Sequence, residues 1–241
     1  NLPPANSLSL AVDAQGQARL AWYNTQDDAL MYALRAGDAW RVETVDDSAD
    51  VGEYASLGLD RAGRPHIAYH DRNARTLKYA HHDGQAWRIE VVDAEGQAGF
   101  HASLVVGADD TVYIAYHAQP RGILKSAIGR LGDWTVETRL AAEAPKGTYA
   151  SIALSPTTGH PAISYRDDAL AGLGYTHRTE QTWHRGTIDF EGNDMGTFTA
   201  LAFDPDGVQH IAYRDNTDRV LKHAAKTEFS WLREVVDPDG D

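Results

Sequence analysis

Residues 54–93 read YASLGLDRAGRPHIAYHDRNARTLKYAHHDGQAWRIEVVD, and they decide the fold because they contain four short apolar runs separated by turn residues. The runs lie at 55–59, 66–70, 77–81 and 87–92, and the breaks between them carry Ala-Gly, Asn and Asp-Gly. Short runs rich in Val, Ile, Leu, Tyr and Trp with such breaks predict antiparallel strands joined by hairpins. The stretch therefore predicts a four-stranded antiparallel unit.

The same unit occurs five times along the chain. Its first strand begins in turn at Ser9, Ser56, Ser103, Ser151 and Ala200. The third run of each copy begins with leucine, at Leu30, Leu77, Leu124, Leu173 and Leu221, and the fourth run begins with tryptophan, at Trp40, Trp87, Trp134, Trp183 and Trp231. Four strands in a repeat of about 40–50 residues are typical of a propeller blade.

We therefore predict an all-β fold, a five-bladed β-propeller with four antiparallel strands per blade. Residues 1–241 would form a single domain, with blades at about 7–53, 54–100, 101–148, 149–197 and 198–241. The alternative is an open β-solenoid of the same unit, which would leave exposed edge strands at both ends. We expect the repeated tryptophan to pack against the neighbouring blade, and the alternative is an aromatic platform for sugar in each blade.

Composition excludes several classes of function. The 241 residues carry 35 acidic and 22 basic side chains, a net charge of −13, which argues against binding to nucleic acid or to anionic membranes. The mean hydropathy is −0.46, and no apolar run approaches the ~18 residues that span a bilayer. The absence of cysteine excludes disulfides and thiol nucleophiles. Neither a P-loop nor a G-x-G-x-x-G motif occurs, so we expect no nucleotide cofactor.

The repeat resembles a known family. Its pattern, G-x-[YHF]-[AT]-[SA]-[LI]-x-x-D, then G-x-x-H-I-A-Y-x-D, L-K-Y-A and W-x-x-E-x-V-D, is similar to the tandem repeats of secreted bacterial β-propeller proteins, which are loosely grouped with sialidase-type propellers. The turn at 82–87 keeps the place and the tryptophan of the sialidase Asp-box but not its spacing, and no arginine triad can be transferred. Sialidase activity is therefore not implied. The plan is also similar to five-bladed lectins of the tachylectin-2 type. The resemblance implies a secreted or periplasmic bacterial protein, and we expect a monomer.

Positions that differ between the copies are free of the demands of the fold. The pair formed by the first residue of the inner strand and the last residue of the next strand differs from copy to copy, and we call these ten positions the rim. By the repeat register they pair as Ser7 with Tyr23, Tyr54 with His70, His101 with His117, Tyr149 with Arg166, and Phe198 with Arg214. A glycine lies two residues before the inner position in four copies (Gly52, Gly99, Gly147, Gly196), which predicts a tight turn or a close approach of backbones.

The rim residues suggest two kinds of ligand. His70, His101 and His117 could together hold a divalent transition metal, or they could be polar rim residues bonded to neighbours or water. Arg166 and Arg214 beside Tyr149 could bind a carboxylate, sulfate or phosphate. The alternative for these arginines is ion pairing with Asp167, with Asp215 or with the acidic loops between blades.

Other polar residues have structural interpretations. Asp71, Asp167, Asp215 and Asn24 follow the second strand and are expected to cap turns rather than to act in acid-base chemistry. His66 and His210 begin the second strand and are expected to be scaffold, with Arg19, Tyr113 and Ala162 as equivalents. The remaining histidines (His81, His82, His160, His177, His184, His223) are expected to have no convergent partner. The acidic loops at 46–50, 189–194 and 237–241 could bind calcium but match no EF-hand spacing.

Three functions fit these features. The first is a binding module that holds one polar or anionic ligand, a carbohydrate or other small molecule, through Tyr23, Tyr54, His70, His101, His117, Tyr149, Arg166 and Arg214. The second is an enzyme, either a polysaccharide-lyase-like protein with His70, His101 or Tyr149 as catalytic base, or a metal-dependent hydrolase or oxidase. The third is a scaffold for protein partners. The fold does not decide between them.

Overall fold

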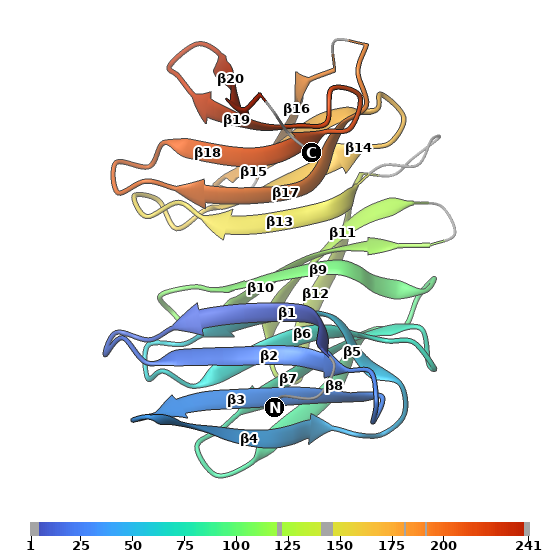
Figure 1. The fold of residues 1–241 in the computed structure, drawn as a ribbon, viewed down its shortest axis with the longest axis vertical. Coiled ribbons are helices and arrows are strands. Elements are labelled where there is room, and N and C mark those ends of the chain that lie inside the picture. Colours follow the sequence, from blue (N-terminus) through green and yellow to red (C-terminus); the bar gives the residue numbers. More distant parts are fainter. Residues whose placement is uncertain (1–4, 120–121, 141–146, 181, 191, 239–241) are drawn as a thin grey trace. The chain divides into compact units, whose positions relative to one another are not determined.

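The computed structural model describes residues 5–119, 122–140, 147–180, 182–190 and 192–238. Every element of regular secondary structure within these ranges is a β-strand. The described residues contain no helix that is long and apolar enough to span a membrane. The strands form five four-stranded sheets, and in each sheet neighbours in sequence are neighbours in space (Figure 1). The prediction of an all-β, five-bladed propeller fold with four antiparallel strands per blade is confirmed.

Each sheet is one blade, and its strands follow the predicted runs. Blade one contains β1 (Ala5–Val12), β2 (Ala18–Asn24), β3 (Ala29–Ala36) and β4 (Ala39–Asp46). Blade two contains β5 (Val51–Leu59), β6 (Pro65–Asp71), β7 (Thr76–His82) and β8 (Trp87–Asp93). Blade three contains β9 (Ala98–Val106), β10 (Val112–Ala118), β11 (Ile123–Arg130) and β12 (Asp133–Leu140). Blade four contains β13 (Thr148–Leu154), β14 (Pro161–Asp167), β15 (Gly172–Thr179) and β16 (Thr182–Asp189). Blade five contains β17 (Met195–Phe203), β18 (Gln209–Asp215), β19 (Val220–Lys226) and β20 (Trp231–Asp237).

The chain divides into two compact units. Unit one comprises residues 1–120 and 126–137, with blades one and two and most of blade three, and unit two comprises residues 121–125 and 138–241, with blades four and five. Within each unit the apolar cores lie between neighbouring blades. Leu30 of blade one packs in one cluster with Leu57 and Tyr69 of blade two, and Leu173 of blade four packs with Leu201 of blade five. The blades are thus held together by the apolar residues that repeat.

The repeated tryptophan packs against the neighbouring blade, as predicted. The ring of Trp87 in blade two meets Tyr32 of blade one edge-on, with 5.3 Å between centroids. Trp134 meets Tyr79 in the same way at 5.0 Å, and Trp231 meets Tyr175 at 5.1 Å. Such edge-to-face pairs stabilise by about 0.5–1.5 kcal/mol beyond the area they bury. A large ring at this position therefore serves the fold, which explains its repetition.

A polar contact between blades also repeats. The hydroxyl of Tyr69 in blade two donates to Asp46, the last residue of blade one, at 2.6 Å, and Lys78 Nζ lies 2.5 Å from the same carboxylate. The hydroxyl of Tyr213 donates to Asp189 at 2.6 Å, where Lys222 is the matching lysine. Because these carboxylates are buried, each needs such partners to offset the loss of hydration.

The repeated serine of the inner strand has a similar purpose. Ser9 Oγ accepts the backbone N–H of Leu57 at 2.9 Å, and Ser56 Oγ accepts the backbone N–H of Leu104 at the same distance. Ser151 accepts from Leu201 at 3.0 Å. Inner strands of neighbouring blades belong to different sheets, so their facing N–H groups lack ladder partners. The serine supplies one, and this accounts for its recurrence at the start of four of the five copies.

The glycines before the rim confirm the predicted close approach of backbones. Gly52, Gly99, Gly147 and Gly196 all have φ between 88° and 115°. A Cβ on Gly52 would lie 2.9 Å from Leu30 Cα, and one on Gly147 would lie 2.4 Å from Leu124 Cβ. Neither the backbone angle nor the space allows a side chain here.

Candidate functional site

The five inner rim positions share an uncommon backbone conformation. The φ angles are positive in every copy: 55° at Ser7, 56° at Tyr54, 50° at His101, 52° at Tyr149 and 53° at Phe198. A residue with a side chain in this left-handed region costs roughly 1–2 kcal/mol. The five strained positions are equivalent, so the fold imposes the conformation. The side chains that it presents differ, and that difference is available to function.

This conformation lies in a β-bulge that changes the predicted pairing. We predicted Tyr54 opposite His70, but Glu53 is the cross-strand partner of His70, and the register shifts between Glu53 and Ser56. The other blades shift in the same way, so that the pairs are Asn6 with Tyr23, Phe100 with His117, Thr148 with Arg166, and Thr197 with Arg214. A bulge places an extra residue in one strand. The predicted pairs were therefore wrong by one residue, and Phe100 joins the rim.

In unit one, rim residues of blades two and three form a cluster of rings, which we call the ring cluster: Tyr54, His70, Phe100 and His101. The rings of Tyr54 and His101 lie 4.8 Å apart between centroids, and those of Tyr54 and Phe100 lie 5.8 Å apart. His70 lies 4.4 Å from Phe100. Tyr54, Phe100 and His101 are half-buried, whereas His70 is buried. The cluster thus combines an accessible aromatic surface with imidazole nitrogens.

The structure does not assemble the predicted histidine metal site at the rim. His70 Nδ1 lies 2.7 Å from the carbonyl oxygen of Ala98, which fixes that nitrogen as a donor to the backbone. Burial lowers the pKa of His70 below its usual value. Across the described residues, one group of three histidine or carboxylate side chains brings its donor atoms within 4.8 Å of one another. It does not contain His70, His101 or His117.

Tyr23, another predicted ligand residue, is committed to a structural contact. Its hydroxyl donates to Asp28 at 2.8 Å and lies 2.7 Å from Asp50 Oδ1, so it ties the β2–β3 turn to the loop that enters blade two. Burial and then the two carboxylates raise the pKa of Tyr23. The residue therefore acts as a hydrogen-bond donor that orders the rim loops of blades one and two.

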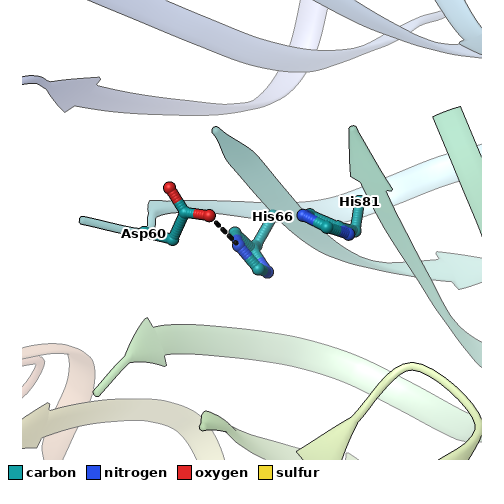
Figure 2. Close-up of side chains that lie close together, drawn as sticks. All are labelled: Asp60, His66 and His81. Atoms are coloured by element: carbon teal, nitrogen blue, oxygen red, sulfur yellow. Dashed lines mark ion pairs between the residues drawn. The ribbon is translucent and has the colours of Figure 1, made fainter. Parts of the chain in front are cut away.

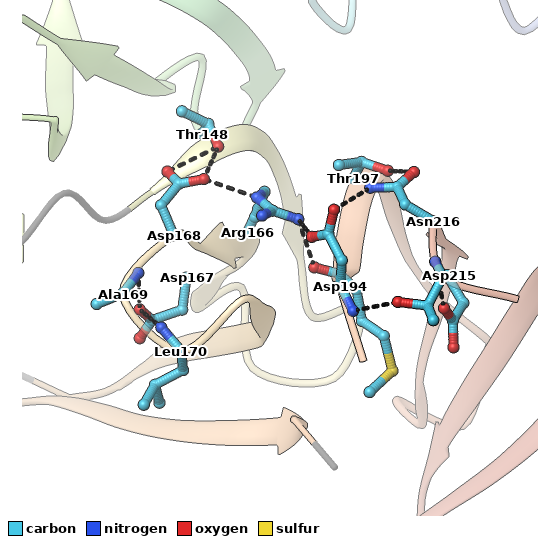
Figure 3. A network of polar contacts seen from close by, with 12 residues as sticks. Thr148, Arg166, Asp167, Asp168, Ala169, Leu170, Asp194, Thr197, Asp215 and Asn216 are labelled. Carbon is cyan, nitrogen blue, oxygen red and sulfur yellow. Dashed lines mark hydrogen bonds and ion pairs between the residues drawn. The ribbon is translucent and has the colours of Figure 1, made fainter. Parts of the chain in front are cut away.

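In unit two, Arg166 is neutralised by neighbouring acids (Figure 3). Its Nε donates to Asp168 at 2.7 Å, and its Nη1 forms an ion pair with Asp194 and donates to the carbonyl of Met195 at 3.0 Å. Thr148 and Asn216 brace the two carboxylates. Of the alternatives for Arg166, ion pairing with the acidic loop between blades is confirmed. The partner within its own turn is Asp168, not Asp167.

Tyr149 and Arg214 are the other predicted anion-binding residues of unit two. Tyr149 lies 4.8 Å from Phe198 between ring centroids, and Phe198 is 66% exposed. Arg214 is exposed and lies opposite Thr197 in the register. The guanidinium of Arg166 is already paired with two carboxylates, so it is not available for the anion site that we predicted from Arg166 and Arg214.

The acidic residues after the second strand cap turns, as predicted. Asp71 accepts the backbone N–H of Ala74 at 2.7 Å, and Asp215 accepts those of Thr217 and Asp218. Asp167 and Asn24 make the equivalent bonds to their turns. In the candidate calcium loops, Asp46 and Asp189 are occupied by the tyrosine and lysine contacts between blades. Residues 191 and 239–241 of those loops lie outside the described residues.

At the other end of strand β6, three side chains form a chain of polar contacts. His66 Nδ1 lies 2.5 Å from the hydroxyl of Tyr79, and His66 Nε2 lies 3.6 Å from Asp60 Oδ2. Blade one has Asp13, Arg19 and Tyr32 in the same places, with contacts of 2.9 and 3.0 Å. Blade five has Asp204, His210 and His223. The prediction that His66 and His210 belong to the repeated scaffold is thus supported.

The expectation that the remaining histidines lack convergent partners was wrong for four of them. The ring of His81 stacks on His66 with 4.3 Å between centroids and 27° between planes. His177 stacks on His184 at 5.3 Å, and His223 contacts His210. The signal was present in the sequence. His70 pairs with Leu77 across a hairpin, so four residues outward His66 must pair with His81, as it does.

Comparisons with known proteins show a similarity of fold. No family model matches the chain, and no curated protein matches it. Among solved structures, the chain is similar to a protein of unknown function from Dyadobacter fermentans DSM 18053, with a TM-score of 0.70 and 13% identity, covering 98% of this chain and 84% of that chain. A mutant of the Aleuria aurantia lectin AAL in complex with Fucalpha1-6GlcNAc has a TM-score of 0.63 and 14% identity, over 97% and 78%. Hadza microbial sialidase Hz136 has a TM-score of 0.60 and 13% identity, and the match covers 97% of this chain and 58% of the sialidase. At these identities the likeness is one of fold: the chain has a β-propeller fold of the kind found in lectins and sialidases.

Proposed function

We propose that this protein binds a neutral carbohydrate at the ring cluster of blades two and three. The observation that carries the proposal is the pair formed by Tyr54 and His101, two half-buried rings 4.8 Å apart that are both held at strained left-handed positions. Aromatic faces pack against the C–H groups of sugar rings, while tyrosine hydroxyls and imidazole nitrogens serve sugar hydroxyls. Aromatic walls with a few polar groups are the usual lining of small-molecule sites.

The charges nearby favour a neutral over an anionic sugar. Glu53 precedes Tyr54, and Asp50 belongs to the adjoining loop. Arg72 lies 3.5 Å from Glu53 and 3.4 Å from Asp50, so the one guanidinium in these contacts is shared between two carboxylates. An added carboxylate would meet net negative charge here, which opposes its binding. One of the structures with a similar fold is a lectin in complex with Fucalpha1-6GlcNAc, and it supports the same class of ligand by analogy alone.

The test is isothermal titration with a panel of neutral sugars that includes Fucα1-6GlcNAc, and with sialic acid as the anionic comparison. The diagnostic variant is Tyr54→Gly, because glycine adopts the left-handed conformation freely and removes only the ring. We expect affinity for the best neutral sugar to fall by about tenfold, as the loss of one stacked ring implies. Unfolding free energy should stay within about 1 kcal/mol of the parent, since relief of strain offsets the lost ring contacts.

The matched control is Phe198→Gly, which makes the same change at the equivalent left-handed position of blade five. We expect it to leave sugar affinity unchanged. Equal loss of affinity in both variants, tighter binding of sialic acid than of any neutral sugar, or no sugar binding by the folded protein would each contradict the proposal.

A further inference from the structure

Asp60, His66 and His81 of blade two form a compact cluster of side chains that can ligate a metal (Figure 2). Asp60 lies in the turn after β5, while His66 and His81 are cross-strand partners on β6 and β7. One donor atom from each side chain lies within 4.8 Å of the other two. The three residues lie within a single blade, so the rigid hairpins of one sheet hold them.

Two nitrogens of this cluster lack hydrogen-bond partners among the described residues. His66 Nε2 and His81 Nε2 are both buried, and neither has a hydrogen bond there, although His66 Nε2 lies 3.6 Å from Asp60 Oδ2. The side chain of His66 is 5% exposed. A buried polar atom left unsatisfied costs about 1–3 kcal/mol, so a pair of them in one place indicates a missing ligand. His66 and His81 both line one cleft, which has a volume of about 160 Å³.

The protonation states suit metal binding. Burial and then the charge of His81 lower the pKa of His66 to about 4, and burial also lowers the pKa of His81. Burial acts to raise the pKa of Asp60, but hydrogen bonds from Arg64 outweigh it and leave that pKa below its usual value. At neutral pH the cluster therefore offers two neutral imidazoles and one carboxylate, the forms that metals require.

We propose that Asp60, His66 and His81 bind a divalent transition metal ion, with zinc as the best-suited occupant. Two imidazoles and a carboxylate form a common zinc set, and a fourth position would remain open toward the cleft. The hydroxyl of Tyr79 fixes His66 through Nδ1 and leaves Nε2 for the metal, the arrangement that orients ligating histidines in metalloproteins. This site lies on blade two away from the ring cluster, and it does not depend on the proposed sugar binding.

Two local adjustments accompany binding. The rings of His66 and His81 are stacked, and imidazole lone pairs lie in the ring planes, so His81 must turn its ring for both nitrogens to face one ion. Arg64 Nε donates to Asp60 Oδ2 at 2.6 Å and must yield that oxygen. The Arg64 side chain is 41% exposed and can move into solvent, while its backbone N–H still holds Asp60 Oδ1 at 2.8 Å.

Blade five supplies a natural control within the same chain. His210 Nδ1 lies 3.0 Å from His223 Nε2, and His223 Nδ1 lies 2.9 Å from Glu234. Both nitrogens of His223 are thus engaged by protein groups. Blade five thus shares the aspartate and the first histidine of the cluster, but His223 stands where blade two has Tyr79 and Ala225 stands where blade two has His81.

The experiment is titration of chelator-treated protein with Zn²⁺, followed by calorimetry and by elemental analysis after dialysis. We expect one equivalent of zinc. His81→Ala should weaken binding by at least about 100-fold, because a direct ligand contributes more than the residues behind it. His223→Ala should bind as the parent does. Co²⁺ in place of zinc should give the intense visible absorption of a low-coordinate site in the parent and not in His81→Ala.

Circular dichroism and thermal unfolding establish that each variant is folded. If Asp60→Asn or His66→Gln unfolds, His81→Ala still decides the question, since its side chain is only partly buried and its removal leaves the turn at Asp60 intact. Absence of zinc binding by the folded parent overturns the proposal, and so does unchanged affinity in His81→Ala. Equal weakening in His223→Ala overturns it too, because the zinc would then be bound unspecifically by surface histidines.

Discussion

Blades two and five place an aspartate and a histidine in equivalent positions and give them different surroundings. In blade two, the His66 side chain is 5% exposed and its hydroxyl partner is Tyr79. In blade five, the His210 side chain is 39% exposed and its partner is another histidine, His223. The repeat thus sets which residues meet, while burial sets whether their polar atoms are satisfied by protein, by water or by an added ligand.

In blade two, residues of the neighbouring blade three lie against the histidine cluster. His66 lines a cleft between blades two and three. Its other walls include Tyr79 and His81 of blade two and Asp110 and Arg130 of blade three. Trp134 of blade three also packs on Tyr79. A scaffold contact becomes a candidate site where a neighbour removes water from it without supplying hydrogen bonds.

The largest effect that we expect from this contrast is on the pH dependence of stability. The pKa of His66 is lowered to about 4 in the folded protein against 6.5 when exposed, so the folded state favours the neutral ring. The stabilisation is complete above pH 6.5 and is lost as the pH falls from 6.5 toward 4, because the unfolded state binds the proton first. Between pH 7 and pH 4.5 this amounts to about 2 kcal/mol.

The measurement is urea unfolding at several pH values without metal. In His66→Gln the decline in unfolding free energy toward pH 4.5 should be shallower than in the parent by that amount. The groups that face this ring, Asp60, Arg64, Tyr79 and His81, together with Asp110 and Arg130 of blade three, stay unchanged in the variant. His210→Gln is the matched control at the exposed position, and a slope change as large as that of His66→Gln would contradict the role of burial.

The next effect concerns the hydroxyl behind His66. Tyr79→Phe keeps the ring that packs on Trp134 but removes the 2.5 Å contact with His66 Nδ1. Loss of such an orienting partner weakens metal binding about 10- to 100-fold. Calorimetry with Zn²⁺ measures this, and Tyr175→Phe in blade four is the control, since Tyr175 occupies the equivalent position with Ala162 in place of the histidine. Unchanged zinc affinity in Tyr79→Phe would mean that the hydroxyl does not orient a ligand.

The sequence predicts the scaffold well because identical demands recur. Leu77, Trp87 and Ser56 serve contacts between blades, and the leucine and tryptophan recur in every copy while the serine recurs in four of the five. The inner rim could not be predicted in detail, because the left-handed bulge at Tyr54 runs against the ordinary preference of an aromatic residue. The partners of Arg166 depend on the course of the loop at Asp194, which no strand pattern fixes. The pairing of His66 with His81 follows from hairpin register alone, but its burial depends on blade three.

A smaller effect should follow from substitution of Arg64, which blade five replaces with Val208 beside Asp204 and His210. Arg64→Gln removes a positive charge next to the proposed ion and frees Asp60 Oδ2. Because like charges repel at this distance, we expect zinc to bind more tightly, by less than about tenfold given the exposure of Arg64. Without metal, the variant should lose some stability through the lost ion pair. Weaker zinc binding in Arg64→Gln would show that the guanidinium assists the site rather than competing with the metal.

The smallest effect is expected at His223 of blade five, where both ring nitrogens already have hydrogen-bond partners. Glu234→Gln removes the charge that lies 2.9 Å from His223 Nδ1, but Glu234 is exposed and the amide oxygen of glutamine can still accept a hydrogen bond. Exposed ion pairs of this kind contribute about 0–1 kcal/mol. Chemical unfolding should therefore change by less than about 0.5 kcal/mol, and zinc stoichiometry should not change at all. If Glu234→Gln instead gained a second equivalent of zinc, loss of one exposed charge beside a histidine would be enough to create a site, and two buried nitrogens without hydrogen bonds would not be needed.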